Sequence, residues 1–509
     1  MWFLPLALPA VPLEKPPGNL ENPIVRGFAP DPSVCRVGKD FYLVNSSFEY
    51  FPGVPIRHST DLSNWTLIGH CLTRPSQLPL DGQPSSAGIY ATTLRYHDGV
   101  FYMVTTNVGA GGNFFVTATR IEGPWSEPVK IPVQSIDPSL FWDEDGTCYL
   151  TVQGDQGIRQ AKFDPKTGKL LSALKVIWTG TGGQYPEGPH LFKHNGVYFL
   201  TIAEGGTEYG HMQTLARSKS PWGPFESCPF NPILTHRSIR SPFQAIGHAD
   251  FFDDGKGAWW AACLGIRPQG YPYAHCLGRE TFLVPVQWGA DGWPHLGDDG
   301  RVPETLDLLA SANVDAEETT DFEGGKIPLT WDYLRNPDAS AYRADPAGGL
   351  RLMARPIFLD TPHSPTWIGR PQTHFNSEFR VDCEPRLEGD GEAGISIRMN
   401  DRHRIELFRR GGEVCMRATI GPLSQIVKSE PVTPGPCTLI VRTYPDRYAM
   451  SCISAGNTLD LGSIESRYLS TEVAGGFTGV MLGVYAYDKN ARGYLRVIRA
   501  TYKPLGDRT

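Results

Sequence analysis

The sequence predicts an all-β protein, a five-bladed β-propeller followed by a β-sandwich. Three observations support this: a turn-and-strand phrase recurs five times in the first 300 residues, longer alternating strands follow after residue 320, and no long stretch has a helical period. The 509 residues include 55 Gly and 44 Pro, as expected for many short strands and turns. With 24 Phe, 20 Tyr and 12 Trp, the composition excludes a disordered chain.

The repeated phrase is a turn followed by an aromatic-rich apolar strand. Its copies read GKDFYLVNSS from Gly38, DGVFYMVTTN from Asp98, DGTCYLTVQG from Asp145, NGVYFLTIAE from Asn195 and DGKGAWWAAC from Asp254. Asp-Gly and Asn-Gly favour tight hairpins, whose two central residues need φ > 0. A four-stranded propeller blade takes ~40–50 residues and insertions lengthen it, so the spacing of the copies predicts five blades. A β-sandwich with the same hairpins is the alternative.

The strand before each turn is the one that a propeller places against its central axis. Asp31 and His248 lie seven residues before their turn glycines, and Asp137, Glu187 and Tyr90 lie nine before theirs. Since side chains alternate along a strand, offsets that differ by two share a face. The repeat therefore predicts three carboxylates and a histidine in one axial pocket, where unpaired charges are costly.

Carboxylates gathered in this way can hydrolyse a glycosidic bond. One protonated carboxyl group donates a proton to the leaving oxygen, while an ionised one activates water or attacks directly. A third acidic group raises the pKa of the acid by repulsion. A single Asp beside a Pro is ordinarily a turn cap, but three acidic residues at matched positions favour a function.

The motifs that surround these residues resemble those of family 43 glycoside hydrolases, which are five-bladed propellers. The resemblance runs in order over roughly residues 20–300 and rests on APDPSV, IDPSLFWDEDG, YPEGPHLF, AEGGTEYGH, IGHADFF, LGRETF and DGWPHLG. It implies that Asp31 is the general base, Glu187 the general acid, and Asp137 the residue that tunes and orients the acid. It also implies inversion of configuration, with the base and the acid ~6.5–9.5 Å apart.

The same resemblance implies residues that bind the sugar. Phe48 matches a residue that packs on the sugar, and Thr207 and Arg279 match polar contacts to sugar hydroxyls or to the acids. His248 matches a histidine that contacts the base, in some relatives through a central ion such as calcium. No metal is required by the sequence, so a single water-held Ca²⁺ near His248 stays open.

One departure concerns substrate choice. Relatives commonly read IWAP where residues 89–92 of this chain read IYAT, so Tyr90 and Ala91 line the expected sugar site in an altered form. Tyr90 can still stack on a sugar, but its hydroxyl changes the shape of the pocket.

The chain divides into an N-terminal extension (1–20), the propeller (21–302), an acidic linker (303–320) and a second domain (321–509). Runs such as EAGISIRMN, CTLIVRTY and GYLRVIRATY predict an antiparallel sandwich, and this stretch resembles the concanavalin-like domain of many family members. Phe477, in AGGFTGVMLGV, is either a core aromatic or a residue of the pocket rim. A closed rim would confine cleavage to chain ends.

Composition also limits partners and location. The net charge of −7 argues against nucleic acid, and no apolar run reaches the ~18 residues of a membrane span. Ten scattered cysteines without a CxxC pair are expected to be buried thiols. The apolar opening MWFLPLALPAVPL lacks a basic residue and contains three prolines, so it is a poor signal peptide and the location stays open between cytoplasm and secretion.

We therefore expect an inverting, exo-acting hydrolase that releases xylose from the non-reducing end of xylo-oligosaccharides. An α-L-arabinofuranosidase acting on arabinoxylan, or a bifunctional enzyme, is the alternative. The remaining alternative is a propeller that binds carbohydrate without hydrolysing it. The expected partner is an oligosaccharide or polysaccharide, and a homo-oligomer stays open.

Overall fold

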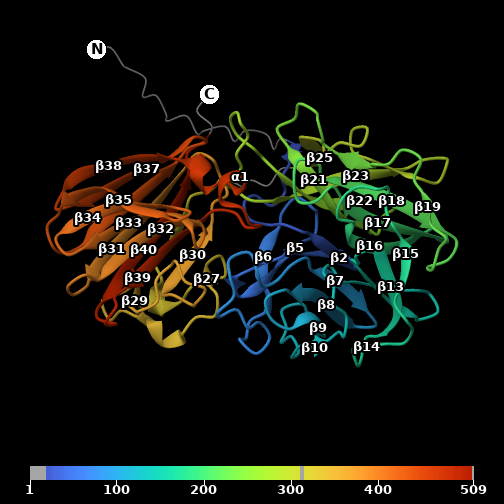
Figure 1. Cartoon of the computed structure of the whole chain (residues 1–509), viewed down its shortest axis with the longest axis horizontal. Coiled ribbons are helices and arrows are strands. Elements are labelled where there is room, and N and C mark those ends of the chain that lie inside the picture. The colour runs from blue at the N-terminus through green and yellow to red at the C-terminus, as the bar shows by residue number, and fades with distance from the viewer. Residues whose placement is uncertain (1–18, 310–314, 507–509) are drawn as a thin grey trace, which may run out of the picture.

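The computed structural model describes residues 19–309 and 315–506, which form two β-rich bodies side by side (Figure 1). The propeller runs from blue to yellow-green, and the sandwich runs from yellow to red. The apolar opening considered as a signal peptide lies outside the described residues. No helix in the described part of the chain is long and apolar enough to cross a membrane.

The propeller has five antiparallel blades, which confirms the predicted fold class. The strands of the first two blades are β2 (Ser33–Val37), β3 (Asp40–Val44), β5 (Gly53–Ser59) and β6 (Thr66–Leu72), then β7 (Thr93–His97), β8 (Val100–Asn107), β9 (Gly112–Ala118) and β10 (Val129–Lys130). Those of the third and fourth are β11 (Ser139–Trp142), β12 (Cys148–Val152), β13 (Ile158–Asp164), β14 (Lys169–Leu170) and β15 (Lys175–Trp178), then β16 (Glu187–His194), β17 (Val197–Glu204), β18 (Met212–Ser218), β19 (Glu226–Ser227) and β20 (Leu234–Thr235). The fifth contains β21 (Gln244–Asp253), β22 (Trp259–Ile266), β23 (Glu280–Trp288) and β24 (Pro294–Leu296).

Each predicted hairpin turn joins the first two strands of a blade. In two of them both central residues have positive φ, as a tight turn requires: Asp98 and Gly99 at 47° and 80°, and Asn195 and Gly196 at 49° and 76°. In the other three only the glycine does.

Residues with positive φ and β-bulges, rather than simple alternation, determine which side chains face the propeller axis. Asp31, Asp137 and His248 have φ of 49°, 54° and 53°, and each lies two residues before a polar strand residue. In the fourth blade the residue with this conformation is Gly188, at 57°. Simple alternation therefore does not explain the predicted placement of Glu187 or His248, because β16 has a register shift between Glu187 and His190 and β21 has one between Gly247 and Asp250.

The predicted linker is also corrected. Strand β25 (Thr305–Leu309) pairs with β1 (Asn19–Glu21), so the first part of that segment belongs to a two-stranded sheet with the start of the described chain. Strand β26 (Glu318–Thr320) pairs with β40 of the sandwich.

The second domain consists of two eight-stranded sheets. The first contains, in spatial order, β35 (Leu423–Pro431), β34 (Glu413–Ile420), β33 (His403–Arg410), β32 (Glu392–Asn400), β39 (Met481–Tyr487), β30 (Trp367–Pro371), β27 (Asp332–Leu334) and β4 (Tyr50–Phe51). The second contains β28 (Tyr342–Ala344), β29 (Leu350–Met353), β40 (Tyr494–Pro504), β31 (Ser377–Arg386), β36 (Cys437–Thr443), β37 (Arg447–Ser454) and β38 (Asn457–Glu465), with β26 beside β40. The short helical turns are η1 (Glu323–Gly325), η2 (Ala339–Ala341), η3 (Ser466–Leu469) and α1 (Thr471–Ala474).

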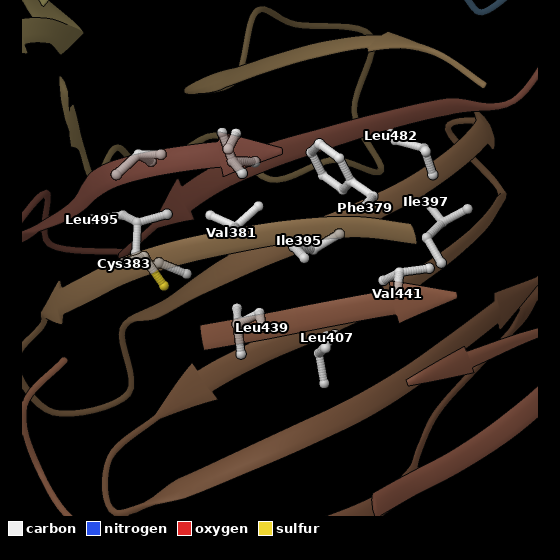
Figure 2. Packing of buried hydrophobic residues seen from close by; sticks show 14 of the residues in the cluster. Phe379, Val381, Cys383, Ile395, Ile397, Leu407, Leu439, Val441, Leu482 and Leu495 are labelled. Atoms are coloured by element: carbon white, nitrogen blue, oxygen red, sulfur yellow. The ribbon is translucent and has the colours of Figure 1, made fainter. Parts of the chain in front are cut away.

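Alternate residues of the facing strands fill the sandwich core. Phe379 and Val381 of β31, with Ile395 and Ile397 of β32 and Leu439 of β36, are fully buried and point into the space between the sheets (Figure 2). All ten cysteines of the chain are buried and free of disulfides, as expected.

Strand β4 ties the two bodies together. It belongs to the propeller portion of the sequence, yet it pairs with β27, with Tyr50 opposite Leu334 and Phe51 opposite Tyr333. The loop just before β4 carries Ser46 and Phe48, so the edge of the sandwich supports a loop of the axial pocket.

Candidate active site

Asp31 lies at the axial end of the first blade as a buried, well-supported carboxylate. Its Oδ1 accepts a hydrogen bond of 2.6 Å from Arg279 Nη1, and its Oδ2 accepts one of 2.6 Å from Ser46 Oγ. His248 Nδ1 is 3.9 Å from Oδ1. Burial alone would raise the pKa of Asp31, but Arg279, His248 and Ser46 together hold it below its ordinary value. Asp31 is therefore ionised at neutral pH and can accept a proton.

Glu187 has the opposite electrostatic environment. Burial and the negative charges of Asp137 and Asp31 raise its pKa to about 8, although Arg279 opposes them. Glu187 is therefore largely protonated at neutral pH and can donate a proton. A pair of carboxyl groups with separated pKa values is the arrangement needed for acid–base catalysis.

Asp137 connects the other two acids. Burial raises its pKa, against the positive influence of His248. Its Oδ2 accepts a hydrogen bond of 3.0 Å from the backbone N–H of Gly188, the residue after Glu187. Gly188 must be glycine, because a Cβ there would lie 2.8 Å from His248 Nε2. Asp137 thus fixes the backbone at the acid and keeps negative charge beside it.

Three aromatic rings cluster beside the acids. The ring centroids of Phe48 and Tyr90 are 5.1 Å apart, those of Phe48 and Phe477 5.9 Å, and those of Tyr90 and Phe477 5.8 Å. The Arg279 guanidinium lies 5.6 Å from the Phe48 ring and 5.8 Å from that of Phe477. Phe477 is therefore part of the pocket rim and not of the sandwich core, which decides between the two alternatives for this residue.

Hydrogen bonds from the propeller hold the Phe477 backbone. Arg279 Nη2 donates to its carbonyl oxygen over 3.3 Å, and its own N–H donates to Ser86 Oγ over 2.9 Å. The backbone N–H of Ser86 donates in turn to Glu49 Oε2, again over 2.9 Å. The sandwich residue is thus bound to the propeller residues that surround the base.

Behind Glu49 lies an ion-pair network that joins the two domains. Arg398 Nη1 is 3.4 Å from Glu49 Oε1, and its Nη2 is 2.6 Å from Asp401 Oδ1. Arg335 Nη2 is 2.7 Å from Asp401 Oδ2. Both guanidinium groups and Glu49 are fully buried. Since Glu49 follows Phe48 directly, the network fixes the loop that carries this aromatic residue.

A second group of buried polar residues links the first strands of neighbouring blades. Asp250 accepts hydrogen bonds from Arg95 Nη1 (2.8 Å) and Nη2 (2.9 Å) and from Ser33 Oγ (2.7 Å). Arg95 Nη2 also lies 3.1 Å from His190 Nδ1. Four blades are linked in this way, which stabilises the axis on which the acids stand.

Two of the predicted binding residues make no direct contact with the acids. Thr207 lies on the turn after β17, and no hydrogen bond joins it to a carboxylate within the described residues. The Ala91 carbonyl oxygen accepts a hydrogen bond of 3.2 Å from Thr105 Oγ1. Their contacts to sugar stay predictions.

Sequence reasoning missed Ser46 and His211. The pKa of His211 is lowered to about 3, chiefly by burial, so the ring is neutral, and its edge underlies Gly247, where a Cβ would meet it at 2.9 Å. Ser46 stands in the repeat copy GKDFYLVNSS and His211 in AEGGTEYGH, but a serine or a histidine at these places does not by itself indicate its contact in the structure.

The described residues do not form a metal site of their own. Among them no group of three or more His, Cys, Asp or Glu side chains converges as metal ligands. His248 supplies one ring nitrogen near a carboxylate that Arg279 and Ser46 already engage. This donor set does not fit a calcium ion coordinated mainly by protein.

Comparison with known proteins agrees with this site. Residues 20–294 match the model of glycosyl hydrolases family 43, and residues 319–503 match the beta xylosidase C-terminal concanavalin A-like domain. The chain belongs to glycoside hydrolase family 43. It is an enzyme that hydrolyses glycosidic bonds, and its two domains are the catalytic propeller and the C-terminal sandwich of this family.

Relatives within family 43 match nearly the whole chain. A non-reducing end α-L-arabinofuranosidase of Bacteroides ovatus is 44% identical over 92% of this chain and 91% of its own. A xylosidase/arabinosidase of Butyrivibrio fibrisolvens is 38% identical over 91% of this chain and 95% of its own. The crystal structure of a xylan β-1,4-xylosidase from Bacillus halodurans superposes with a TM-score of 0.90 at 33% identity, covering 95% of this chain and all of the other. The glycan substrates of this family are therefore the relevant class.

Proposed function

We propose that this family 43 enzyme is an inverting, exo-acting pentosidase that removes terminal α-L-arabinofuranose and β-xylose, with the arabinofuranoside preferred. The observation that carries the reaction type is the opposed protonation of Asp31 and Glu187 in one buried pocket. The similarity at 44% identity to a non-reducing end α-L-arabinofuranosidase supports the order of the sugars. β-Xylose remains the second candidate because the model that matches the C-terminal domain is named for a β-xylosidase and one relative is named a xylosidase/arabinosidase.

In the proposed reaction, Glu187 donates its proton to the glycosidic oxygen as the bond to the anomeric carbon breaks. Asp31 removes a proton from a water molecule whose oxygen attacks that carbon from the opposite face. Atoms and charge balance: the leaving alcohol gains the proton of Glu187, and Asp31 gains the proton of the water. A single displacement of this kind inverts the anomeric configuration.

The rim supports action at chain ends. Phe477, Phe48 and Tyr90 form a continuous aromatic wall, and Phe477 is held by the propeller through Arg279 and Ser86. We infer that a wall on this side confines the pocket to a terminal sugar, whose apolar face packs on the rings. The Arg279 guanidinium, directed at Asp31 and over two of the rings, would orient the sugar hydroxyls beside the base.

Hydrolysis of nitrophenyl α-L-arabinofuranoside and nitrophenyl β-xyloside, compared under identical conditions, tests the proposal. We expect cleavage of both with a higher kcat/KM for the arabinofuranoside, and NMR of the first-formed sugar should show the inverted anomer. A retained anomer would refute the mechanism, and a higher kcat/KM for the xyloside would reverse the order of the sugars. Activity on neither substrate would favour a binding propeller.

A water-held calcium ion near His248 stays a separate prediction, since the protein side chains alone do not build a site. Treatment with EDTA, followed by calcium, tests it: lost activity restored by calcium supports such an ion. Unchanged activity argues against a required metal.

A further inference from the structure

A second cavity lies between the first blade and the sandwich. It has a volume of about 730 Å³, within the ~300–1,000 Å³ typical of small-molecule sites. Its walls come from β1, β5 and β6 of the propeller portion and from β27, β30 and β40 of the sandwich. Asp137, Glu187, Tyr90 and Phe477 do not line it, so it is not the pocket of the catalytic acids.

Three polar side chains in this cavity lack the partners that buried groups normally have. No hydrogen bond joins the Asp332 carboxylate to a described residue, and its side chain is only 19% exposed. His70 Nε2 is 4.0 Å from Asp332 Oδ1, and His70 Nδ1 has no partner although the side chain is 3% exposed. The Arg57 guanidinium makes one hydrogen bond within the described chain, of 3.0 Å from Nη1 to Asn45 Oδ1. The buried His70 Nδ1 therefore needs water or a ligand, and the half-buried Arg57 and Asp332 have donor and acceptor positions that a ligand could use.

The charges of the cavity favour a neutral occupant. Arg26 is paired with Asp315 at 2.8 Å, and Arg370 with Glu318 at 2.8 Å. This leaves Arg57, a cationic donor, and Asp332, an acidic acceptor, which interact electrostatically with each other. Because their charges are opposite, the pair favours neither an anion nor a cation. Burial raises the pKa of Asp332 to about 7, against the opposing charge of Arg57, and burial lowers the pKa of His70 to about 3. His70 is therefore neutral and adds no charge to the Arg57–Asp332 pair.

The shape of the lining agrees with a sugar. Phe28 and Trp65, both half-buried, offer aromatic surface in the same cavity as Arg57 and Asp332. Adjacent hydroxyls of a sugar can accept from a guanidinium and donate to a carboxylate, while its C–H face packs on an aromatic ring.

We propose that this cavity is a second carbohydrate site, which binds a neutral pentose through Arg57 and Asp332. The choice of a pentose rests on the proposed function, because the released sugar is the neutral polyol present at the enzyme. Phe28 extends from this cavity to the active site, since its ring centroid is 6.0 Å from that of Phe48. Phe28 would thus separate a bound sugar in this cavity from the aromatic wall of the catalytic pocket.

Equilibrium dialysis of the full-length enzyme with radiolabelled L-arabinose and D-xylose tests the proposal. The wild type should bind two molar equivalents of at least one of these sugars at saturation. Asp332→Leu and Arg57→Met should each bind one while still hydrolysing the nitrophenyl pentosides. Asp446→Leu is the control, because Asp446 is 69% exposed and does not line this cavity, and it should bind two.

A wild type that binds at most one equivalent of both sugars, or an Asp332→Leu variant that retains two, would overturn the second site. Neither result can be caused by misfolding of a variant. The first is measured on the wild type, and the second is a variant that still binds both equivalents and is therefore folded. Failure of the proposed function would give a different result from failure of the second site. The nitrophenyl pentosides would remain intact, and Arg279→Met, a change in the catalytic pocket, would not reduce the number of sugars bound.

Discussion

Asp31, Asp137 and Glu187 share one pocket but differ in what surrounds each carboxylate. Asp31 faces Arg279, Ser46 and His248, whereas Glu187 faces the other two acids. The pKa of each carboxyl group in this site is therefore set by the charged and polar groups around it rather than by whether it is Asp or Glu. The limbs of the pH–rate profile follow: kcat/KM should fall at acid pH as Asp31 gains a proton, and above about pH 8 as Glu187 loses one.

Asp137→Asn should move only part of this profile. Removing the negative charge beside Glu187 lowers the pKa of that acid, so the alkaline limb of kcat/KM should shift to lower pH. Asp145→Asn is the matched control, because Asp145 belongs to the same blade but lies on its exposed turn. If the alkaline limb stays in place in Asp137→Asn, or moves equally in the control, Asp137 does not tune the acid.

At the scale of the element, short segments from distant parts of the chain hold the site loops. Arg398 of β32 reaches Glu49, which follows Phe48 and precedes β4. Removing one partner of a buried ion pair costs about 3–5 kcal/mol, because the other charges stay buried. An exposed pair is worth about 0–1 kcal/mol.

Arg398→Met should therefore lower the free energy of unfolding by about 3–5 kcal/mol, measured by urea denaturation. Arg447→Met should change it by about 1 kcal/mol or less, because Arg447 and its partner Asp446 are 46% and 69% exposed. Equal denaturation midpoints for the two variants would show that the network does not support the interface.

The elements that sequence reasoning found are those with local signals. The hairpin turns at Gly38, Gly99, Gly146, Gly196 and Gly255 identified all five blades, because a tight turn imposes its residue types within a few positions. The bulge after Glu187 leaves no such signal, so alternation alone does not explain how Glu187 reaches the pocket of the other two acids. The contact of Glu49 with Arg398 spans 349 residues, and one sequence cannot pair positions so far apart.

At the scale of the whole molecule, the two domains are parts of one structure. Strand β4 completes a sandwich sheet, Phe477 completes the propeller pocket, and Arg335 binds the backbone oxygen of Gln83 at 2.7 Å. Division of the sequence into a propeller and a sandwich described the two bodies but not this interlocking. Loss of either body would expose buried charges of the other.

We therefore expect the domains to unfold together. Differential scanning calorimetry of the full chain should give a single transition, and loss of pentosidase activity should follow the same curve. Two well-separated transitions, with the sandwich signal distinct from the loss of activity, would contradict this coupling.

The assignment of Glu187 as the proton donor is the central claim, and the leaving-group dependence of Glu187→Gln tests it most directly. An oligosaccharide needs a proton on its leaving oxygen, whereas a dinitrophenolate leaves without one. The variant should lose about 10²–10⁴-fold in kcat on a terminal pentosyl oligosaccharide and retain most of its activity on the dinitrophenyl pentoside. Equal losses on both substrates, or full activity on the oligosaccharide, would contradict the assignment.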